Sequence, residues 1–392
     1  MTRALSHLHT RIPAQAWLVL VVLGLVTLLG CSCGGSGGGA RRSEIRVALL
    51  QGVPEVRIGG SKRVTIRTQP GGRTIYAGTP GTSAVKINHH ARGVLVRDRR
   101  YDAERLEARI EGGAGIEVNG RPYRGRVTVL RNRRDLTVIN TLSLENYTRA
   151  VVPAEMMPSA SPAALKAQAI VARSFGAYHV RRNGSRPFDI PASRIVYKGM
   201  DREDPRTNKV VDATRGTVLT YRGRLLLPYF SACCGGHTEY AHNVWPGEQR
   251  TTRPVKCPYC KGTPHYSWRA RLSGDELGRK LRSLGIGKVL SIRVVKRSRA
   301  GRRVVSLRVT HADGVTIVPL NTFRLLVGPG VIRSGLFDLD VQNGKFLFAG
   351  RGWGHAVGLC QWGAMVMADK GKSSRDILAF YFPRARLSRL GR

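Results

Sequence analysis

Acidic residues are scarce in this sequence of 392 residues. Only 25 side chains are Asp or Glu, against 65 Lys or Arg, and the formal net charge is +40. A surface this basic favours an anionic partner, which can be nucleic acid, acidic lipid or acidic polysaccharide. The sequence lacks zinc-finger, helix-turn-helix and RNA-binding signatures, so we expect no nucleic-acid partner. The arginines are spread along the whole chain without a single basic tract, so simple solvation of the surface explains the charge equally well.

The sequence also lacks internal repeats, and beyond its N-terminus it lacks any apolar run long enough to cross a membrane. Hydrophobic residues make up 42% of the chain, which is enough for a packed core and argues against wholesale disorder. The length is that of one large domain or two modest ones.

The N-terminus has the layout of a secretory signal. Arg3 and Arg11 precede an apolar run over residues 16–29, and Cys31 follows that run. The tetrapeptide that ends at Cys31 is similar to a bacterial lipobox, in which a cysteine after a small residue is acylated. An uncleaved anchor helix is the alternative, but the run is short for one. Because both place the rest of the chain outside the cytoplasm, we expect an exported lipoprotein, anchored in a membrane at Cys31 and facing the periplasm or cell wall.

Short apolar segments between turn signals predict strands from residue 43 to about residue 140. Ser161 and Pro162 are typical of a helix start, and the apolar spacing that follows predicts a long helix to Arg182. Ser143 predicts a shorter helix that breaks at Pro153. Strand-like sequence then returns, so the expected fold class is α+β, dominated by strands. The expected division of the chain is a lipoprotein signal peptide at 1–30, a Gly/Ser-rich tether at 31–42, a β-rich N-terminal region at 43–118 and a second domain at 119–388.

Four short motifs occur in a fixed order along the second domain. They are Pro-Ala-Glu-Met at 153–156, Ala-Leu-Lys-Ala-Gln-Ala at 164–169, Gly-Gly-His-Thr at 235–238, and Gly-Trp-Gly-His followed by Gln-Trp-Gly-Ala within 352–364. Together they resemble the SpoIID/LytB family of stage II sporulation protein D and amidase enhancers, over roughly residues 120 to 385. An ordered set of this kind is more specific than any single motif. The resemblance implies a role on peptidoglycan, a possible cell-wall amidase as partner, and either lytic cleavage of glycan strands or non-catalytic enhancement of the amidase.

Glu155 is the candidate catalytic residue. The resemblance implies that the glutamate of the Pro-Ala-Glu-Met motif acts as the acid in glycan cleavage. Its neighbours in sequence are apolar, and a carboxyl that loses solvation has a raised pKa and can stay protonated as a general acid. The alternative is a structural role, in which Glu155 caps the helix near Pro162 or pairs with Lys166 or Arg173.

Further polar and aromatic residues of the motifs are candidate substrate contacts. Arginine binds carboxylates in a bidentate manner, tryptophan offers a flat face for a sugar ring, and histidine and glutamine can bind hydroxyl groups. For the charged and polar residues the alternative is a solvated helix face, and for the tryptophans it is a glycine-rich core turn. The candidates are Lys166, Gln168, Arg173, Trp353, His355, Gln361 and Trp362.

Five cysteines lie beyond the tether, which is an odd number. Cys234 with His237, followed by Cys257 with Cys260, gives two paired-ligand knuckles close to the spacing of a tetrahedral zinc site. Four protein ligands would make such a site closed and structural. The alternative is disulfide bonding in an oxidising compartment, for example between Cys257 and Cys260. Cys360 is not part of the expected ligand set and can approach Cys233.

Overall fold

The computed structural model describes residues 44–79, 84–245 and 253–390. The expected signal peptide, the tether and Cys31 therefore lie outside the described residues. From residue 42 onward the chain forms one compact unit. No helix within the described ranges is long and apolar enough to span a membrane.

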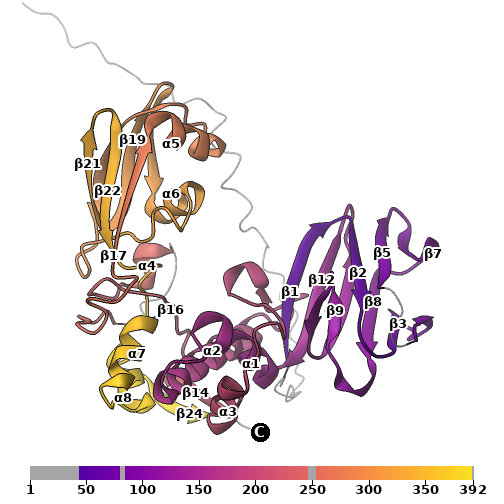
Figure 1. Cartoon of the computed structure of the whole chain (residues 1–392). Helices are drawn as coiled ribbons and strands as arrows, with labels where there is room; N and C mark the ends of the chain where they lie inside the picture. The colour runs from indigo at the N-terminus through magenta and orange to yellow at the C-terminus, as the bar shows by residue number, and fades with distance from the viewer. Residues whose placement is uncertain (1–43, 80–83, 246–252, 391–392) are drawn as a thin grey trace, which may run out of the picture. The chain divides into compact units, whose positions relative to one another are not determined.

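Two antiparallel sheets form the N-terminal part (Figure 1). The first has the strand order β13-β1-β12-β11-β8-β3-β4, in which the short strand β13 is parallel to β1. Its strands are β1 (Glu44–Val53), β3 (Val64–Gln69), β4 (Thr74–Ala77), β8 (Arg105–Ile110), β11 (Arg126–Arg131), β12 (Leu136–Ser143) and β13 (Ile190–Pro191). The second has the order β10-β9-β2-β5-β6-β7. Its strands are β2 (Glu55–Gly59), β5 (Val85–His90), β6 (Gly93–Val96), β7 (Arg99–Tyr101), β9 (Ile116–Val118) and β10 (Arg121–Tyr123).

Strand β12 is the centre of this arrangement because it is buried on both faces from Leu136 to Leu142. It pairs with β1 on one side and β11 on the other. A single apolar cluster joins residues of both sheets to α1 (Leu144–Glu155) and α2 (Pro162–Arg182). The first sheet thus continues beyond residue 118 and leads directly into the helices.

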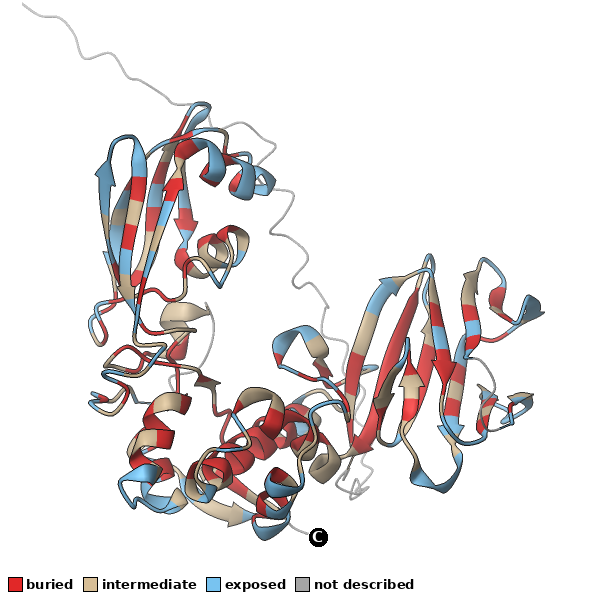
Figure 2. Ribbon diagram, viewed as in Figure 1, coloured by how far each residue is buried: buried red, intermediate tan, exposed pale blue. Residues whose placement is uncertain are grey.

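Helix α1 begins at Ser143, whose side chain accepts a hydrogen bond from the backbone N–H of Asn146 (3.2 Å). The predicted break at Pro153 is wrong: α1 continues through this proline to Glu155. Pro153 is buried within the helix, so its ring packs in the core although it cannot donate a backbone hydrogen bond. Helix α2 confirms the predicted long helix and is buried on nearly all sides, as Figure 2 shows. Helix α3 (Pro205–Ala213) packs against both.

A second apolar cluster packs the other face of α2 against α7 (Gln361–Asp369) and α8 (Ser374–Tyr381). The same region holds the small sheets β15-β14-β24 and β16-β23. Its remaining elements are β14 (Thr217–Tyr221), β15 (Arg224–Leu225), β16 (Phe230–Ser231), β23 (Leu359–Cys360), β24 (Arg386–Arg389) and α4 (Ala241–Val244).

A third cluster forms the core of residues 267–351. Two three-stranded antiparallel sheets, β17-β22-β21 and β18-β19-β20, contribute to it together with two helices. The elements are β17 (Ser267–Ser273), α5 (Gly274–Leu281), β18 (Val289–Arg297), β19 (Val304–His311), β20 (Gly314–Pro319), α6 (Leu320–Val327), β21 (Phe337–Gln342) and β22 (Lys345–Arg351). The expected fold class, α+β with strands dominating, is confirmed.

Candidate functional site

Glu155 is the last residue of α1 and is partly buried. One carboxylate oxygen, Oε1, accepts a hydrogen bond from the backbone N–H of Val196 (3.0 Å). Burial raises the pKa of this carboxyl above the ordinary value of a glutamate, and the Val196 N–H and the Gln361 side chain oppose that rise. Within the described ranges Glu155 forms no ion pair with Lys166 or Arg173. The carboxyl is therefore desolvated without a neutralising cation, which is the setting that a general acid needs.

A pair of stacked tyrosines includes one, Tyr147, that lies near this carboxyl. Tyr147, two turns before Glu155 on α1, is fully buried, and its hydroxyl has no hydrogen-bond partner among the described residues. Burial and the nearby charge of Glu155 raise the pKa of Tyr147. Its ring stacks on that of Tyr197 at 6.0 Å, and Tyr197 donates a hydrogen bond to Asn140 Oδ1 (2.6 Å). Both phenols stay neutral, so they add no negative charge that would compete with Glu155.

Gln361 and Trp362 open helix α7 and connect Glu155 to a group of aromatic side chains. Gln361 is buried, and its Nε2 has no hydrogen-bond partner of regular geometry among the described residues although it approaches Glu155. The ring of His265 contacts Trp362 at 5.5 Å and Trp353 at 4.6 Å, both edge to face. The two tryptophans are partly exposed. They therefore offer apolar surface, and Trp362 follows directly after the glutamine that approaches Glu155.

Arg333 completes this aromatic group. Its guanidinium lies over the Trp353 ring, 4.6 Å from the ring centroid. Burial and the positive charge of Arg333 lower the pKa of His265, so the imidazole is neutral at physiological pH. A flat cation over an indole fixes the ring and leaves a positive charge beside it.

The candidate residues of α2 separate into three cases. Lys166 is partly exposed and forms no hydrogen bond or ion pair with any described residue. Gln168 is fully buried, and neither its amide nitrogen nor its oxygen has a partner within the described chain. Arg173 corrects the sequence prediction, because it is fully buried and holds Glu145 in a bidentate ion pair (3.0 and 2.8 Å). Its remaining N–H groups bind Thr214 and the carbonyls of Val211 and Thr217, so the guanidinium of Arg173 joins α2 to neighbouring parts of the fold.

His355 is packed away from the two tryptophans. Its ring lies against Trp245 (4.8 Å) and Tyr229 (6.0 Å), and its Nδ1 accepts a hydrogen bond from the N–H of Val357 (3.0 Å). Burial, together with the positive charge of Arg324, lowers the pKa of His355 to about 3. A neutral, packed imidazole can position the surrounding loop but supplies no proton at neutral pH.

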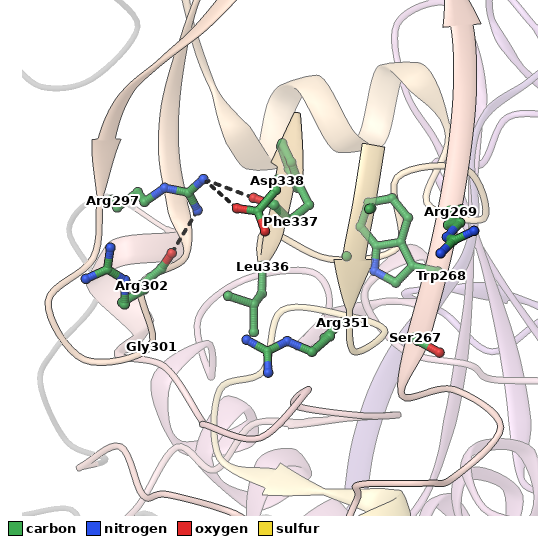
Figure 3. A pocket seen from close by; sticks show the side chains of 12 residues that line it. Ser267, Trp268, Arg269, Arg297, Gly301, Arg302, Leu336, Phe337, Asp338 and Arg351 are labelled. Atoms are coloured by element: carbon green, nitrogen blue, oxygen red, sulfur yellow. Dashed lines mark hydrogen bonds and ion pairs between the residues drawn. The ribbon is translucent and has the colours of Figure 1, made fainter. Parts of the chain in front are cut away.

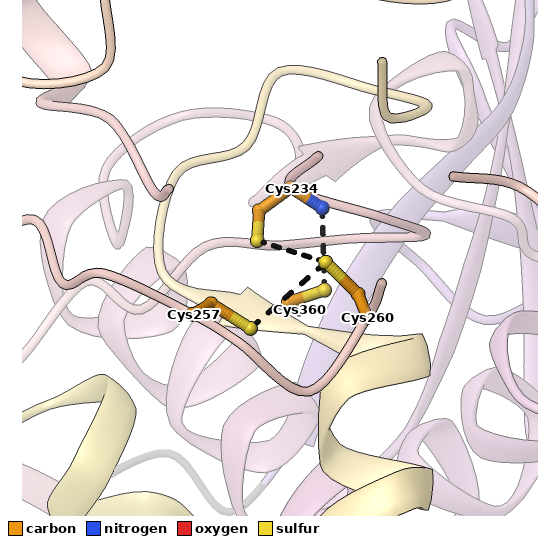
Figure 4. Close-up of side chains that lie close together, drawn as sticks. All are labelled: Cys234, Cys257, Cys260 and Cys360. Carbon is orange, nitrogen blue, oxygen red and sulfur yellow. Dashed lines mark hydrogen bonds between the residues drawn. The ribbon is translucent and has the colours of Figure 1, made fainter. Parts of the chain in front are cut away.

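Four buried cysteines form a compact cluster, shown in Figure 4. The Sγ atoms of Cys234, Cys257, Cys260 and Cys360 all lie within 4.8 Å of one another. Cys260 Sγ is 3.5 Å from Cys234 Sγ and 4.0 Å from Cys257 Sγ. These distances are far from a disulfide bond, and all five described cysteines are free thiols. A tetrahedral zinc–thiolate site has an edge of about 3.8 Å, given Zn–S bonds of about 2.3 Å.

The surroundings of this cluster suit thiolate ligands. Cys360 Sγ accepts hydrogen bonds from the backbone N–H groups of Cys234 (3.2 Å) and Gly363 (3.4 Å). The buried guanidinium of Arg303 donates to the carbonyl of Cys234 and brings a positive charge to the cluster. N–H donors and a cation both stabilise negative sulfur. The four sulfurs therefore fit a soft divalent metal in number, spacing and charge.

The fourth member of this cluster differs from the sequence prediction. Cys234, Cys257 and Cys260 come together as expected, but Cys360 takes the place assigned to His237. His237 turns its Nδ1 to the carbonyl of Thr238 (2.7 Å). The reason is topological, because β16 and β23 pair in parallel and set Cys360 beside the loop after Ser231.

Comparison with known proteins places these residues in a family context. The family described as stage II sporulation protein (SpoIID) matches residues 132–221, and a domain of unknown function (DUF8618) matches residues 259–358. A protein of Brachyspira hyodysenteriae without assigned function is 32% identical over 280 residues, which cover 68% of this chain and 73% of that protein. The amidase enhancer of Bacillus subtilis is 30% identical over 281 residues, covering 60% of this chain and 39% of the enhancer. Stage II sporulation protein D of Bacillus amyloliquefaciens is 29% identical over 261 residues, covering 62% and 74%.

Proposed function

The chain belongs to the SpoIID/LytB family, and from that premise we propose that it is a lytic transglycosylase of peptidoglycan. Its substrate would be denuded glycan strands, from which the stem peptides have been removed. The observation that carries the proposal is the carboxyl of Glu155, which has a raised pKa caused by burial, lies within the region that matches the family, and has no neutralising partner among the described residues.

In this mechanism Glu155 acts first as an acid. The protonated carboxyl donates its proton to the glycosidic oxygen as the bond from that oxygen to the anomeric carbon of muramic acid breaks. The Val196 N–H, which binds Oε1, holds the carboxyl in place and stabilises the carboxylate that forms. The raised pKa keeps a useful fraction protonated at the start of each cycle.

Glu155 then acts as a base, which is why a second catalytic carboxylate is unnecessary. The C6 hydroxyl of the same muramic acid attacks the anomeric carbon and gives up its proton to the Glu155 carboxylate. One C–O bond breaks, another forms within the sugar, and the carboxyl regains its proton without consuming water. The product carries a 1,6-anhydro-muramic end.

The aromatic group beside Glu155 supports this assignment. Trp353 and Trp362 present partly exposed rings on which sugars can stack, and the Gln361 side chain approaches the Glu155 carboxyl. Lys166 and Gln168 are further candidate contacts on α2. Denuded strands carry a free carboxylate on every muramic acid, and a basic protein would attract such a polyanion.

The decisive experiment compares Glu155→Gln with the wild type on denuded strands, with mass analysis of the products. We expect folding and glycan binding to persist and cleavage to fall by at least about a hundredfold. Glu104→Gln, which changes an exposed glutamate, is the matched control and should cleave normally. Products with reducing ends would indicate a hydrolase, and undiminished cleavage by Glu155→Gln would remove Glu155 from the mechanism.

A second candidate function is that of a non-catalytic, peptidoglycan-binding protein that enhances an N-acetylmuramoyl-L-alanine amidase. It is supported by the 30% identity to an amidase enhancer. The same assay separates the two. A wild-type protein that leaves denuded strands intact but accelerates release of stem peptides by an amidase would be an enhancer.

We also propose that the four-cysteine cluster holds a structural zinc ion. Four thiolates would close the coordination sphere, so the metal would stabilise the fold and take no part in the reaction. Cys234, Cys257, Cys260 and Cys360 are the ligands in this proposal.

Export and lipid anchoring at Cys31 remain proposals from the sequence. Labelled palmitate should enter the wild type and a Cys33→Ser control but not a Cys31→Ser variant. Label retained after Cys31→Ser would contradict the lipobox.

A further inference from the structure

An arginine-rich cavity of about 950 Å³ lies at one end of the β17-β22-β21 sheet (Figure 3). Its lining includes four arginines but only one carboxylate, that of Asp338. None of the motif residues assigned to glycan cleavage lines it. The arginines are Arg269, Arg297, Arg302 and Arg351.

The register of the sheet explains why the cavity is open. Arg269, Ala349 and Asp338 lie side by side on neighbouring strands, because Arg269 pairs with Ala349 and Ala349 with Asp338. The methyl group of Ala349 leaves a gap between the two charged side chains. Trp268, one residue earlier on β17, is buried and packs toward the core. The hollow is therefore built into the strand order and does not depend on the arrangement of a loop alone.

The four arginines differ in how many hydrogen bonds and ion pairs their guanidinium groups form within the protein. Arg297 is committed, since it donates to the carbonyls of Arg302 (3.1 Å) and Phe337 (3.0 Å) and lies 3.6 Å from Asp338. Arg269 and Arg302 are exposed, and their guanidinium groups form no hydrogen bond or ion pair with any described residue. Asp338 can neutralise one of the four guanidinium charges, so the lining of the cavity keeps a net charge of three positive charges. Guanidinium groups bind oxyanions such as carboxylate in a bidentate manner.

The edge of the cavity lies close in sequence to two members of the aromatic group. Arg351 and Ser267 form a strand pair at its edge. Trp353 lies two residues after Arg351, and His265 lies two residues before Ser267. The rings of Trp353 and His265 are in contact, with 4.6 Å between their centroids. The aromatic group then leads through Trp362 to Gln361 and the catalytic carboxyl.

We propose that this cavity is a distal subsite that binds carboxylates of the glycan strand. This inference rests on the proposed function, because the strand is the one whose cleavage is assigned to Glu155. A strand seated on Trp353 would extend along the β17–β22 pair, and the free lactyl carboxylates of its muramic acids would meet Arg269 and Arg302. Strands that keep their stem peptides carry no such carboxylate on the sugar. The subsite would therefore select denuded strands.

The test is binding of the full chain to fluorescent denuded glycan strands, measured for Arg269→Gln/Arg302→Gln. Neither side chain has a partner within the described residues, so the fold should persist. We expect the Kd to rise about tenfold or more at low salt, the scale for losing charge-assisted hydrogen bonds. Strands whose carboxylates have been converted to amides should bind wild type and variant alike.

Arg293→Gln/Arg308→Gln is the matched control, because it removes the same charge from two exposed, paired positions of β18 and β19 outside the cavity. Its Kd should change less than about twofold, since exposed charges contribute little. Equal losses in both variants would mean general attraction to a basic surface and would overturn the subsite. A cavity variant that loses affinity for a phosphate-bearing wall polymer, but not for glycan, would equally overturn the carboxylate assignment.

This binding assay does not depend on cleavage. A protein that binds through Arg269 and Arg302 but never cuts the strand would refute the chemistry assigned to Glu155 and leave the subsite standing. Normal cleavage with unchanged affinity in the cavity variant would refute the subsite alone.

Discussion

Replacing Cys360 by serine tests the cysteine cluster most directly, because this residue lies 126 positions from Cys234 in sequence and meets it only in the fold. The Sγ–Sγ distances of 3.5 and 4.0 Å bracket the edge of about 3.8 Å expected for zinc and four thiolates. Serine keeps the size of the side chain but offers a poor ligand that stays protonated. Zinc should therefore fall from one ion per chain to a small fraction.

The magnitude follows from what the thiolate does in the fold. Even changes outside the ligand shell weaken metal sites by about 10- to 100-fold, so loss of one ligand should cost at least about a hundredfold in zinc affinity. A hundredfold corresponds to about 2.8 kcal/mol. Since this binding energy is also folding energy, the thermal midpoint should fall by about 5 °C or more. Serine is itself a good N-cap, so the cap that Cys360 forms with the N–H of Gly363 at the start of α7 can persist, and the loss reports the metal ligand.

The assay is metal content by mass spectrometry together with thermal unfolding, on the full chain purified without chelators. His237→Ala is the matched control, since the structure directs His237 to the carbonyl of Thr238, and this variant should keep its zinc. Zinc retained by Cys360→Ser but lost by His237→Ala would refute the cluster as described. Two cysteines found oxidised in the metal-free wild type would favour the disulfide alternative.

Three further outcomes are expected. Because the pKa of Glu155 is raised in the folded chain, the free energy of unfolding of the wild type should fall relative to that of Glu155→Gln as the pH rises from the ordinary glutamate pKa through the raised one. Cleavage should decline over the same pH window. Equal pH profiles of the two proteins in urea unfolding would contradict this. Arg173→Met should lower the free energy of unfolding by about 3–5 kcal/mol, because it leaves Glu145 unpaired; lost glycan binding at unchanged stability would instead indicate a substrate contact. Gly363→Ala should destabilise the chain by about 1–3 kcal/mol, since the new Cβ would lie 2.0 Å from the Tyr381 hydroxyl; thermal unfolding in a Tyr381→Phe background should show part of the loss recovered.

Local signals in the sequence predicted local structure well. Ser161 and Pro162 marked the start of α2, and Ser143 marked that of α1. Four short helices, α3, α4, α6 and α8, were missed, although two of them carry start signals. Asp204 caps α3 next to a proline, and Ser373 forms a capping box with Asp376 at α8. These signals are visible in the sequence, but the apolar periodicity of such short helices is too brief to stand out.

The candidate site was less predictable because its parts meet across long sequence separations. The family motif identified Glu155, but nothing in the sequence indicated that the N–H of Val196 would bind its carboxylate. His265 and Arg333 belong to none of the quoted motifs and enter only through their contacts with Trp353. Arg173 was a candidate substrate contact because arginine binds carboxylates in a bidentate manner, but the carboxylate that it binds is that of Glu145, since α2 is enclosed on nearly all sides and buries it.

The ends of two helices explain how such distant residues form one site. Arg173 on α2 fixes Glu145 in the first turn of α1, and Glu145 also accepts a hydrogen bond from the N–H of Gly216 (3.0 Å). This sets the orientation of α1 and hence the position of Glu155 at its other end. Cys360 belongs to the cysteine cluster and caps α7, which begins with Gln361 and Trp362. The cluster therefore fixes the aromatic side of the candidate site, as the buried ion pair fixes the position of Glu155, so the site depends on both supports.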